Sequence, residues 1–91
     1  MSILEMPCVL WSGGLGEYDI KCVLVEKPYG TSTLTVIENG KELERKVFID
    51  EGKNSDAWRE PFEVAELWRI RYYPRMIAAM RPIYQRYRPR G

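Results

Sequence analysis

The chain of 91 residues has 45% apolar and 30% charged side chains, a composition typical of one folded domain and unlike that of disordered segments. It contains no histidine, which removes the commonest general base near neutral pH and the commonest metal ligand. We therefore expect a single domain over residues 1–91 that is not an enzyme and binds no metal or cofactor. The N-terminal residues do not resemble a signal peptide, because they lack a positively charged start followed by an apolar run, and no stretch of about eighteen apolar residues could span a membrane. Together with the two cysteines, these features predict a cytoplasmic protein without a membrane span.

Charge is distributed unevenly along the chain. Residues 1–56 carry ten acidic and six basic side chains, whereas residues 57–91 carry eight arginines, three glutamates and no lysine. The net charge of +1 therefore conceals an acidic first half and a basic, tyrosine-rich C-terminal third. Arginine presents a planar fork of donors to carboxylates, phosphates and aromatic faces, so this third is the part of the chain best suited to contact a partner.

Residues 3–11 and 18–27 predict the first two strands, because both are rich in β-branched and aromatic residues and are flanked by turn formers. The glycine-rich residues 12–17 predict a flexible hairpin loop, since they lack the lysine and the serine or threonine of a phosphate-binding loop. A hairpin centred in this loop places Cys8 opposite Cys22 on the buried face. A disulfide and two buried thiols both fit that arrangement, and the lack of an electropositive neighbour favours thiols.

Residues 32–38 and 41–49 predict a second hairpin. Asn39-Gly40 between them matches a two-residue type I′ turn, which needs positive φ at both central positions. Counting from this turn places Val36 opposite Leu43, and the alternation continues that buried side through Leu34, Val47 and Ile49. The other side is predicted to face water, with Phe48 as an exception among Thr33, Thr35, Glu42, Glu44 and Lys46.

Residues 50–56 predict a loop by composition, and residues 57–88 predict a helical segment rich in arginine and tyrosine. Pro61 suits a first helical turn, and glutamates follow it near the expected N-terminus. Within residues 67–73, however, apolar and charged side chains also alternate as they would in a fifth strand. Helix is the preferred interpretation because helix-favouring residues lie just upstream.

From residue 76 onward the apolar side chains predict one amphipathic stripe with arginines beside it. Pro82 falls on the outer side and predicts a kink, with a break into two short helices as the alternative. The stripe consists of Met76, Ile77, Met80, Ile83, Tyr84 and Tyr87. The predicted fold class is therefore α+β: a four-stranded antiparallel meander within residues 1–50, followed by a kinked basic C-terminal helix or two short helices.

The C-terminal segment is the candidate partner-binding surface, because tyrosine, tryptophan, methionine and arginine are enriched where proteins contact one another and lysine is depleted there. The predicted function is a non-catalytic interaction or assembly module that forms a homo-oligomer or serves as a small subunit of a larger complex. The residues predicted to contact a partner are Trp68, Arg71, Tyr72, Arg75, Met76, Met80, Arg81, Tyr84, Arg86, Tyr87 and Arg88.

Two other interpretations of the same arginines stay open at this point. One is a nucleic-acid-binding accessory protein, in which arginines neutralise phosphates and tyrosines stack on unpaired bases. The acidic first half of the chain opposes this alternative, because it would repel a phosphate backbone. The other is that the arginines pair with the chain's own carboxylates, where exposed pairs contribute about 0–1 kcal/mol each and require no partner.

Overall fold

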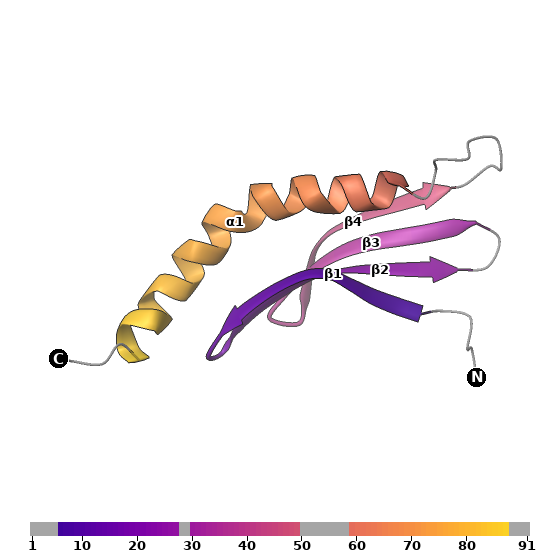
Figure 1. Cartoon of the computed structure of the whole chain (residues 1–91). Helices are drawn as coiled ribbons and strands as arrows, with labels where there is room; N and C mark the ends of the chain where they lie inside the picture. The colour runs from indigo at the N-terminus through magenta and orange to yellow at the C-terminus, as the bar shows by residue number, and fades with distance from the viewer. Residues whose placement is uncertain (1–5, 28–29, 50–58, 88–91) are drawn as a thin grey trace.

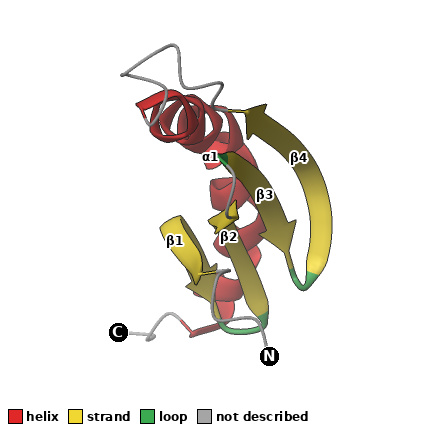
Figure 2. Ribbon diagram, turned by 90° about the vertical axis from the view of Figure 1, so that its right-hand side faces the viewer, coloured by secondary structure: helices red, strands yellow, loops and turns green. Residues whose placement is uncertain are grey.

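The computed structural model describes residues 6–27, 30–49 and 59–87. Four antiparallel strands pair in sequence order, and one helix follows them. Figure 1 shows the helix lying over one face of the sheet and bending along its length, and Figure 2 shows the strands curving past it. The predicted α+β meander with a kinked C-terminal helix is thereby confirmed. The elements are β1 (Met6–Leu15), β2 (Tyr18–Lys27), β3 (Thr31–Glu38), β4 (Lys41–Ile49) and α1 (Arg59–Tyr87).

The core lies between α1 and the face of the sheet that α1 covers. Alternate residues of the two central strands point into it, because successive side chains of a strand alternate between the two faces. The side chains that are almost completely buried are Ile20, Cys22, Leu24, Leu34 and Val36, all from β2 and β3. The helix contributes Ala65, Trp68, Met76 and Ile83 to the same cluster.

The first hairpin differs from the sequence prediction, because β1 continues through the glycine run and ends at Leu15. Only Gly16 and Glu17 form the turn, and an irregularity between Val9 and Trp11 shifts the pairing further. The predicted loop over residues 12–17 is therefore wrong. Glycine is read as a strand breaker from sequence, but Gly13 lies within β1 beside the helix, where a Cβ atom would displace the terminal methyl group of Met76.

This shorter turn also separates the two cysteines. Cys8 pairs with Leu24 and is exposed, whereas Cys22 pairs with Trp11 and is buried. The predicted juxtaposition of Cys8 and Cys22 is wrong, and both are free thiols. Burial raises the pKa of the Cys22 thiol to about 11.

The Asn39-Gly40 turn of the second hairpin is confirmed, with φ of 51° and 81° at its two residues. Beyond the turn, a bulge at Leu43 shifts the register, so that Val36 pairs with Glu44. The extra residue reverses the sides of the rest of β4. Phe48 consequently points to the face of the sheet that the helix covers and is buried. The predicted inward positions of Val47 and Ile49 are wrong, because these side chains are 52% and 70% exposed.

Helix α1 runs without interruption through 29 residues, so neither a fifth strand over residues 67–73 nor a division into two helices occurs. Pro74 and Pro82 lie inside it, and each removes one backbone donor and crowds the carbonyl four residues earlier. The bend visible in Figure 1 follows from these interior prolines. The loop predicted over residues 50–56 lies outside the described residues.

Candidate functional site

Arg75 is the most completely engaged of the predicted contact residues. Its Nε and Nη2 atoms each donate a hydrogen bond to Glu38 of β3, both at 2.8 Å. The phenol of Tyr18 donates to the same carboxylate at 2.7 Å. The bonds from Arg75 hold the pKa of Glu38 below its ordinary value, whereas burial, together with the carboxylate, raises the pKa of Tyr18 to about 12.

Arg71 is held in a similar way by the neighbouring edge strand, β4. It forms an ion pair with Glu44 of β4, and the phenol of Tyr72 donates to the same carboxylate at 2.8 Å. Its guanidinium lies 5.9 Å from the ring centre of Trp68 and 5.2 Å from that of Tyr72. Both the charge and the flat face of Arg71 therefore have partners within the chain.

Like Arg71 and Arg75, the remaining paired arginines of the helix are exposed. Arg86 forms an ion pair with Glu17 in the first turn of the sheet, and Arg69 is paired with Glu66 one helical turn away. The hydrogen bond from Arg69 lowers the pKa of Glu66, whereas a backbone hydrogen bond and then the bond from Arg86 lower the pKa of Glu17. Through Arg71, Arg75 and Arg86, carboxylates of the acidic sheet neutralise charges of the basic helix.

Three predicted contact residues lie in or against the core. Trp68 and Met76 are buried, and Tyr72 is partly buried with its ring centre 6.3 Å from that of Trp11. The indole of Trp11 in turn donates to the Ala65 carbonyl at 2.7 Å, which fastens the helix to β1. These side chains position α1 and offer little surface to another molecule.

The predicted residues that neither belong to the buried core nor form an ion pair or side-chain hydrogen bond with another described residue lie in the C-terminal half of α1. Tyr84 and Tyr87 are 60% and 66% exposed, and Met80 is partly buried. Arg81 is exposed and forms no ion pair with another described residue. Arg88 lies outside the described residues. The structure thus brings together Met80, Arg81, Tyr84 and Tyr87 on one surface.

This surface extends further along the helix than the sequence analysis indicated. Six apolar side chains follow one another at alternating intervals of three and four residues, which keeps them on one side of a helix. Large exposed fractions are found at Ile70 (59%) and Tyr73 (55%) as well as at both tyrosines above. We call this set the outer stripe; it consists of Ile70, Tyr73, Ile77, Met80, Tyr84 and Tyr87.

Ile70 and Tyr73 were missed as contact residues because the sequence pattern was divided at Pro74. The prediction also merged two faces of α1, since Met76 and Ile83 point into the core whereas their neighbours Ile77 and Tyr84 belong to the outer stripe. The 3-4 spacing that continues across both prolines is the signal that could have identified the stripe.

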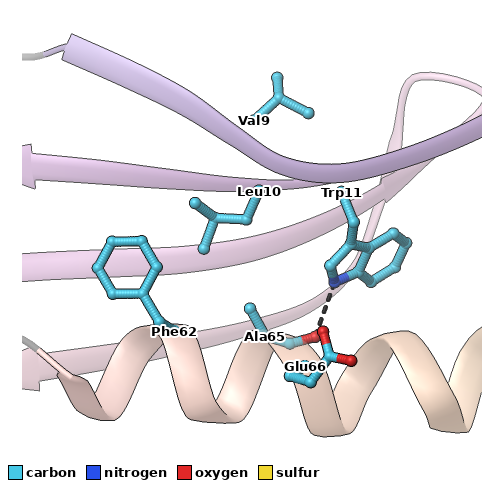
Figure 3. A pocket seen from close by; sticks show the side chains of 6 residues that line it. All are labelled: Val9, Leu10, Trp11, Phe62, Ala65 and Glu66. Carbon is cyan, nitrogen blue, oxygen red and sulfur yellow. Dashed lines mark hydrogen bonds between the residues drawn. The ribbon is translucent and has the colours of Figure 1, made fainter.

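Two hollows lie along the side of the helix that faces β1. One has a volume of about 400 Å³ and is lined by Val9, Leu10, Trp11, Phe62, Ala65 and Glu66. Figure 3 shows these side chains between strand and helix, except Val9, which points away from the helix. The other, of about 310 Å³, is formed by Leu15, Ile77, Met80, Arg81 and Tyr84. The second hollow is mostly apolar and lies at the outer stripe, which gives the stripe a concave flank.

Within residues 6–27, 30–49 and 59–87, no three cysteine, aspartate or glutamate side chains gather into a set that could hold a metal ion. Helix α1, the one helix in this part of the chain, lacks the continuous apolar stretch that crossing a bilayer requires.

No protein-family model matches the chain, and no curated protein or solved structure shows significant similarity to it. The functional argument therefore depends on the geometry of the outer stripe and on the charges around it.

Proposed function

We propose that this protein is a non-catalytic assembly module that associates with itself through the outer stripe of α1. The observation that carries the proposal is the run of six apolar side chains at heptad spacing along the flank of α1 beside β1, where Ile70, Tyr73, Tyr84 and Tyr87 are exposed and the other two are partly buried. Exposed apolar surface of this kind is uncommon on monomeric proteins and marks sites of association. Heptad spacing in particular suits the packing of one helix against another.

The composition of the stripe supports a protein partner over simple exposure to water. The stripe consists of tyrosine, isoleucine and methionine side chains, and aromatic residues and methionine are enriched at the cores of protein interfaces. The opposite face of the sheet also exposes apolar side chains, with Val9 and Val47 53% and 52% exposed on its two edge strands, but Thr33 and Thr35 of β3 lie between these strands, as is usual for the solvated side of an antiparallel sheet. The stripe is therefore the stronger candidate for a contact surface.

The internal ion pairs also favour this function. Because Arg71, Arg75 and Arg86 are paired with sheet carboxylates, the cationic character predicted for the segment is largely neutralised within the chain. What faces solvent along the stripe is apolar surface with isolated charges beside it. Free thiols at Cys8 and Cys22 fit a reducing compartment, so a cytoplasmic location belongs to the proposal.

Sedimentation equilibrium over a wide range of protein concentration tests the proposal. We expect a reversible monomer–dimer equilibrium, and we expect Tyr84→Ser to raise the dimer Kd at least about tenfold because it removes an aromatic contact of the kind found at hot spots. Gln85→Ser is the matched control, since Gln85 is the exposed neighbour of Tyr84 and lies off the stripe. A wild-type protein that stays monomeric at every concentration would overturn the proposal.

Nucleic-acid binding is the second candidate, and one local feature favours it. Arg81 has no ion pair among the described residues and lies one turn from Tyr84, so a phosphate and a stacked base could be contacted together. Binding to single-stranded oligonucleotides at low salt that weakens steeply as salt increases, and weakens again in Arg81→Ala, would support this candidate. Absence of binding at low salt would eliminate it.

A further inference from the structure

The two edge strands of the sheet differ in charge. Strand β1 contains no charged side chain, whereas β4 contains five, which are Lys41, Glu42, Glu44, Arg45 and Lys46. An edge strand presents unpaired N–H and C=O groups, and charged side chains are one means by which proteins keep these groups from pairing with another chain. Among the described residues, β1 pairs with β2 alone, and its other edge lies at one side of the sheet (Figure 2). That edge can therefore accept a further strand without opposition from charges of its own.

The second half of β1 is the part best suited to such pairing. Pro7 has no N–H group to donate, and the irregularity between Val9 and Trp11 interrupts the regular ladder. From Trp11 to Leu15 the pairing with β2 continues without a shift. Gly13 is the middle residue of this regular stretch, so an added strand is expected to centre there.

The middle of the outer stripe lies beside the same stretch of β1. Met76 of the helix lies close to Gly13, since a Cβ atom there would displace its terminal methyl group. Leu15 lines the smaller hollow together with Ile77 and Met80, which are the two central residues of the outer stripe. The uncharged edge of β1 and the outer stripe therefore lie on the same flank of the molecule and have nearly the same centre.

The outer stripe can pair completely with itself when two copies run antiparallel. Its intervals of three, four, three, four and three residues are the same from either end. With the axis midway between residues 77 and 80, every member of the stripe in one copy therefore faces a member in the other. The facing pairs are Ile70 with Tyr87, Tyr73 with Tyr84, and Ile77 with Met80.

A single two-fold axis produces both contacts. If this axis is perpendicular to the sheet and passes beside Gly13, it places β1 of the second copy antiparallel to β1 of the first. The same rotation reverses the direction of the second helix and keeps both helices on one face of the joined sheet. Each outer stripe, on the flank of α1 beside β1, then points toward the other.

Resting on the self-association proposed above, we propose that two copies of this chain join through β1. Their sheets form one sheet of eight strands, four from each copy, and the two outer stripes meet above the junction. The charges of β4 oppose the alternative in which β1 of one copy pairs with β4 of the next, an arrangement that would generate an open row of copies.

The position of the helix makes the second contact possible. Neighbouring strands lie about 4.8 Å apart, whereas packed helices lie about 8–10 Å apart, so both helices must pass close to the junction. The part of α1 from Met76 to Ile83 does so: Met76 lies close to Gly13, and a Cβ atom at Gly16 would lie 2.9 Å from Ile83 Cγ2.

Hydrogen exchange followed by NMR tests the strand pairing. Within residues 11–15, the amides that point away from β2 are unpaired in the monomer, and they should exchange at least about tenfold more slowly when the protein concentration is raised above the dimer Kd. The amides of β4 that point away from β3 are the matched control, because β4 is the other edge strand and should exchange equally fast at all concentrations. Fast exchange of the β1 amides in a dimer confirmed by sedimentation would overturn the strand pairing alone, whereas a protein that is monomeric throughout overturns the proposed function as well.

A charge placed on β1 gives an independent test. Ser12 is exposed on the uncovered face, and in the proposed dimer the two copies of Ser12 are diagonal neighbours about 7–8 Å apart. At low salt, Ser12→Lys and Ser12→Asp should each raise the dimer Kd by about three- to tenfold, because either change brings like charges together. Val47→Lys is the matched control: it adds the same charge to the same face of the other edge strand and should leave the Kd within about twofold of the wild type.

Mixing the two Ser12 variants completes the test. Opposite charges then meet across the junction, so Ser12→Lys and Ser12→Asp chains should form a heterodimer that is tighter than either homodimer. Circular dichroism of each variant as a monomer checks that the fold is retained. Homodimers of both Ser12 variants as tight as the wild type, or a mixture with no preference for the heterodimer, would contradict pairing through β1.

Discussion

Glu38 of β3 and Arg75 of α1 share two parallel hydrogen bonds of 2.8 Å, and this bidentate pair joins the acidic and basic parts of the chain. The carboxylate is mostly buried, with a side-chain exposure of 14%, whereas the guanidinium is 54% exposed. The pair therefore links helix and sheet in a partly buried setting. There, the two aligned hydrogen bonds contribute more to the strength of the contact than the attraction between the charges alone.

Acid should weaken the fold through Glu38. Its pKa is lowered below the ordinary value of 4.5 by Arg75, so its contribution is present above that value and is lost as pH falls through the lower pKa of the folded state. Urea unfolding followed at several pH values should show stability declining below about pH 4.5. In Glu38→Gln the decline should be shallower, with a loss of about 1 kcal/mol or less at neutral pH. An unchanged decline would mean that other carboxylates dominate.

Alkali should weaken the fold through Tyr18. Its pKa is raised to about 12 in the folded state from an ordinary value of 10.0, so the neutral phenol is favoured by folding. Stability from this group is complete below pH 10 and is lost as pH rises toward 12. A titration of phenolate absorbance should contain a late step from Tyr18, and Tyr18→Phe should lack that step. Retention of the late step in the variant would assign it to another tyrosine.

Replacement of Gly16 should destabilise the protein more than replacement of Gly40. Both have positive φ, at 61° and 81°, so alanine strains the backbone at either position by about 1–2 kcal/mol. A Cβ at Gly16 would also lie 2.9 Å from Ile83 Cγ2, whereas at Gly40 it meets nothing within 4 Å. We expect Gly16→Ala to cost about 1–3 kcal/mol beyond Gly40→Ala in denaturant unfolding. Equal losses would show that Ile83 moves away freely.

Truncation of the neighbouring residues Ile83 and Tyr84 should affect the stability of the monomer to very different extents. Ile83 is 6% exposed and packs in the core, so Ile83→Ala should lower the unfolding free energy by about 2–4 kcal/mol. Tyr84 is 60% exposed, so Tyr84→Ala should change the stability of the monomer by about 0.5 kcal/mol or less. Unfolding at low protein concentration measures both. A large loss from Tyr84→Ala under those conditions would place its main contacts within its own chain.

The two thiols should react at different rates. Cys8 is exposed, whereas Cys22 is fully buried and its thiol has a pKa of about 11. An alkylating reagent at neutral pH should modify Cys8 quickly and Cys22 only as fast as the protein opens, because the thiolate is the reactive form and access is required. Mass spectrometry of Cys8→Ser should show almost no labelling until denaturant is added. Rapid labelling of that variant would contradict the burial of Cys22.

Local patterns were sufficient for much of the fold. The Asn39-Gly40 turn, the strand segments of β2, β3 and β4, and the amphipathic C-terminal helix all depend on interactions between residues close in sequence. Such interactions leave direct traces as turn residues, alternation and helical spacing. The register could not be obtained in the same way, because the irregularity in β1 and the bulge at Leu43 change which residues pair across the strands, and neither turn residues nor alternation mark them in the sequence.

For the candidate site, too, some properties followed from the sequence and others only from the packing. By itself the sequence determined that arginine, tyrosine and methionine gather in the C-terminal third, since composition and charge need no folded context. Only the tertiary structure decided which of them remain available: Trp68 and Met76 enter the core, Arg75 is neutralised by Glu38, and Tyr84 faces solvent. The physical reason is that burial and ion pairing join residues tens of positions apart, and the distance between such residues is set by packing and not by their local pattern.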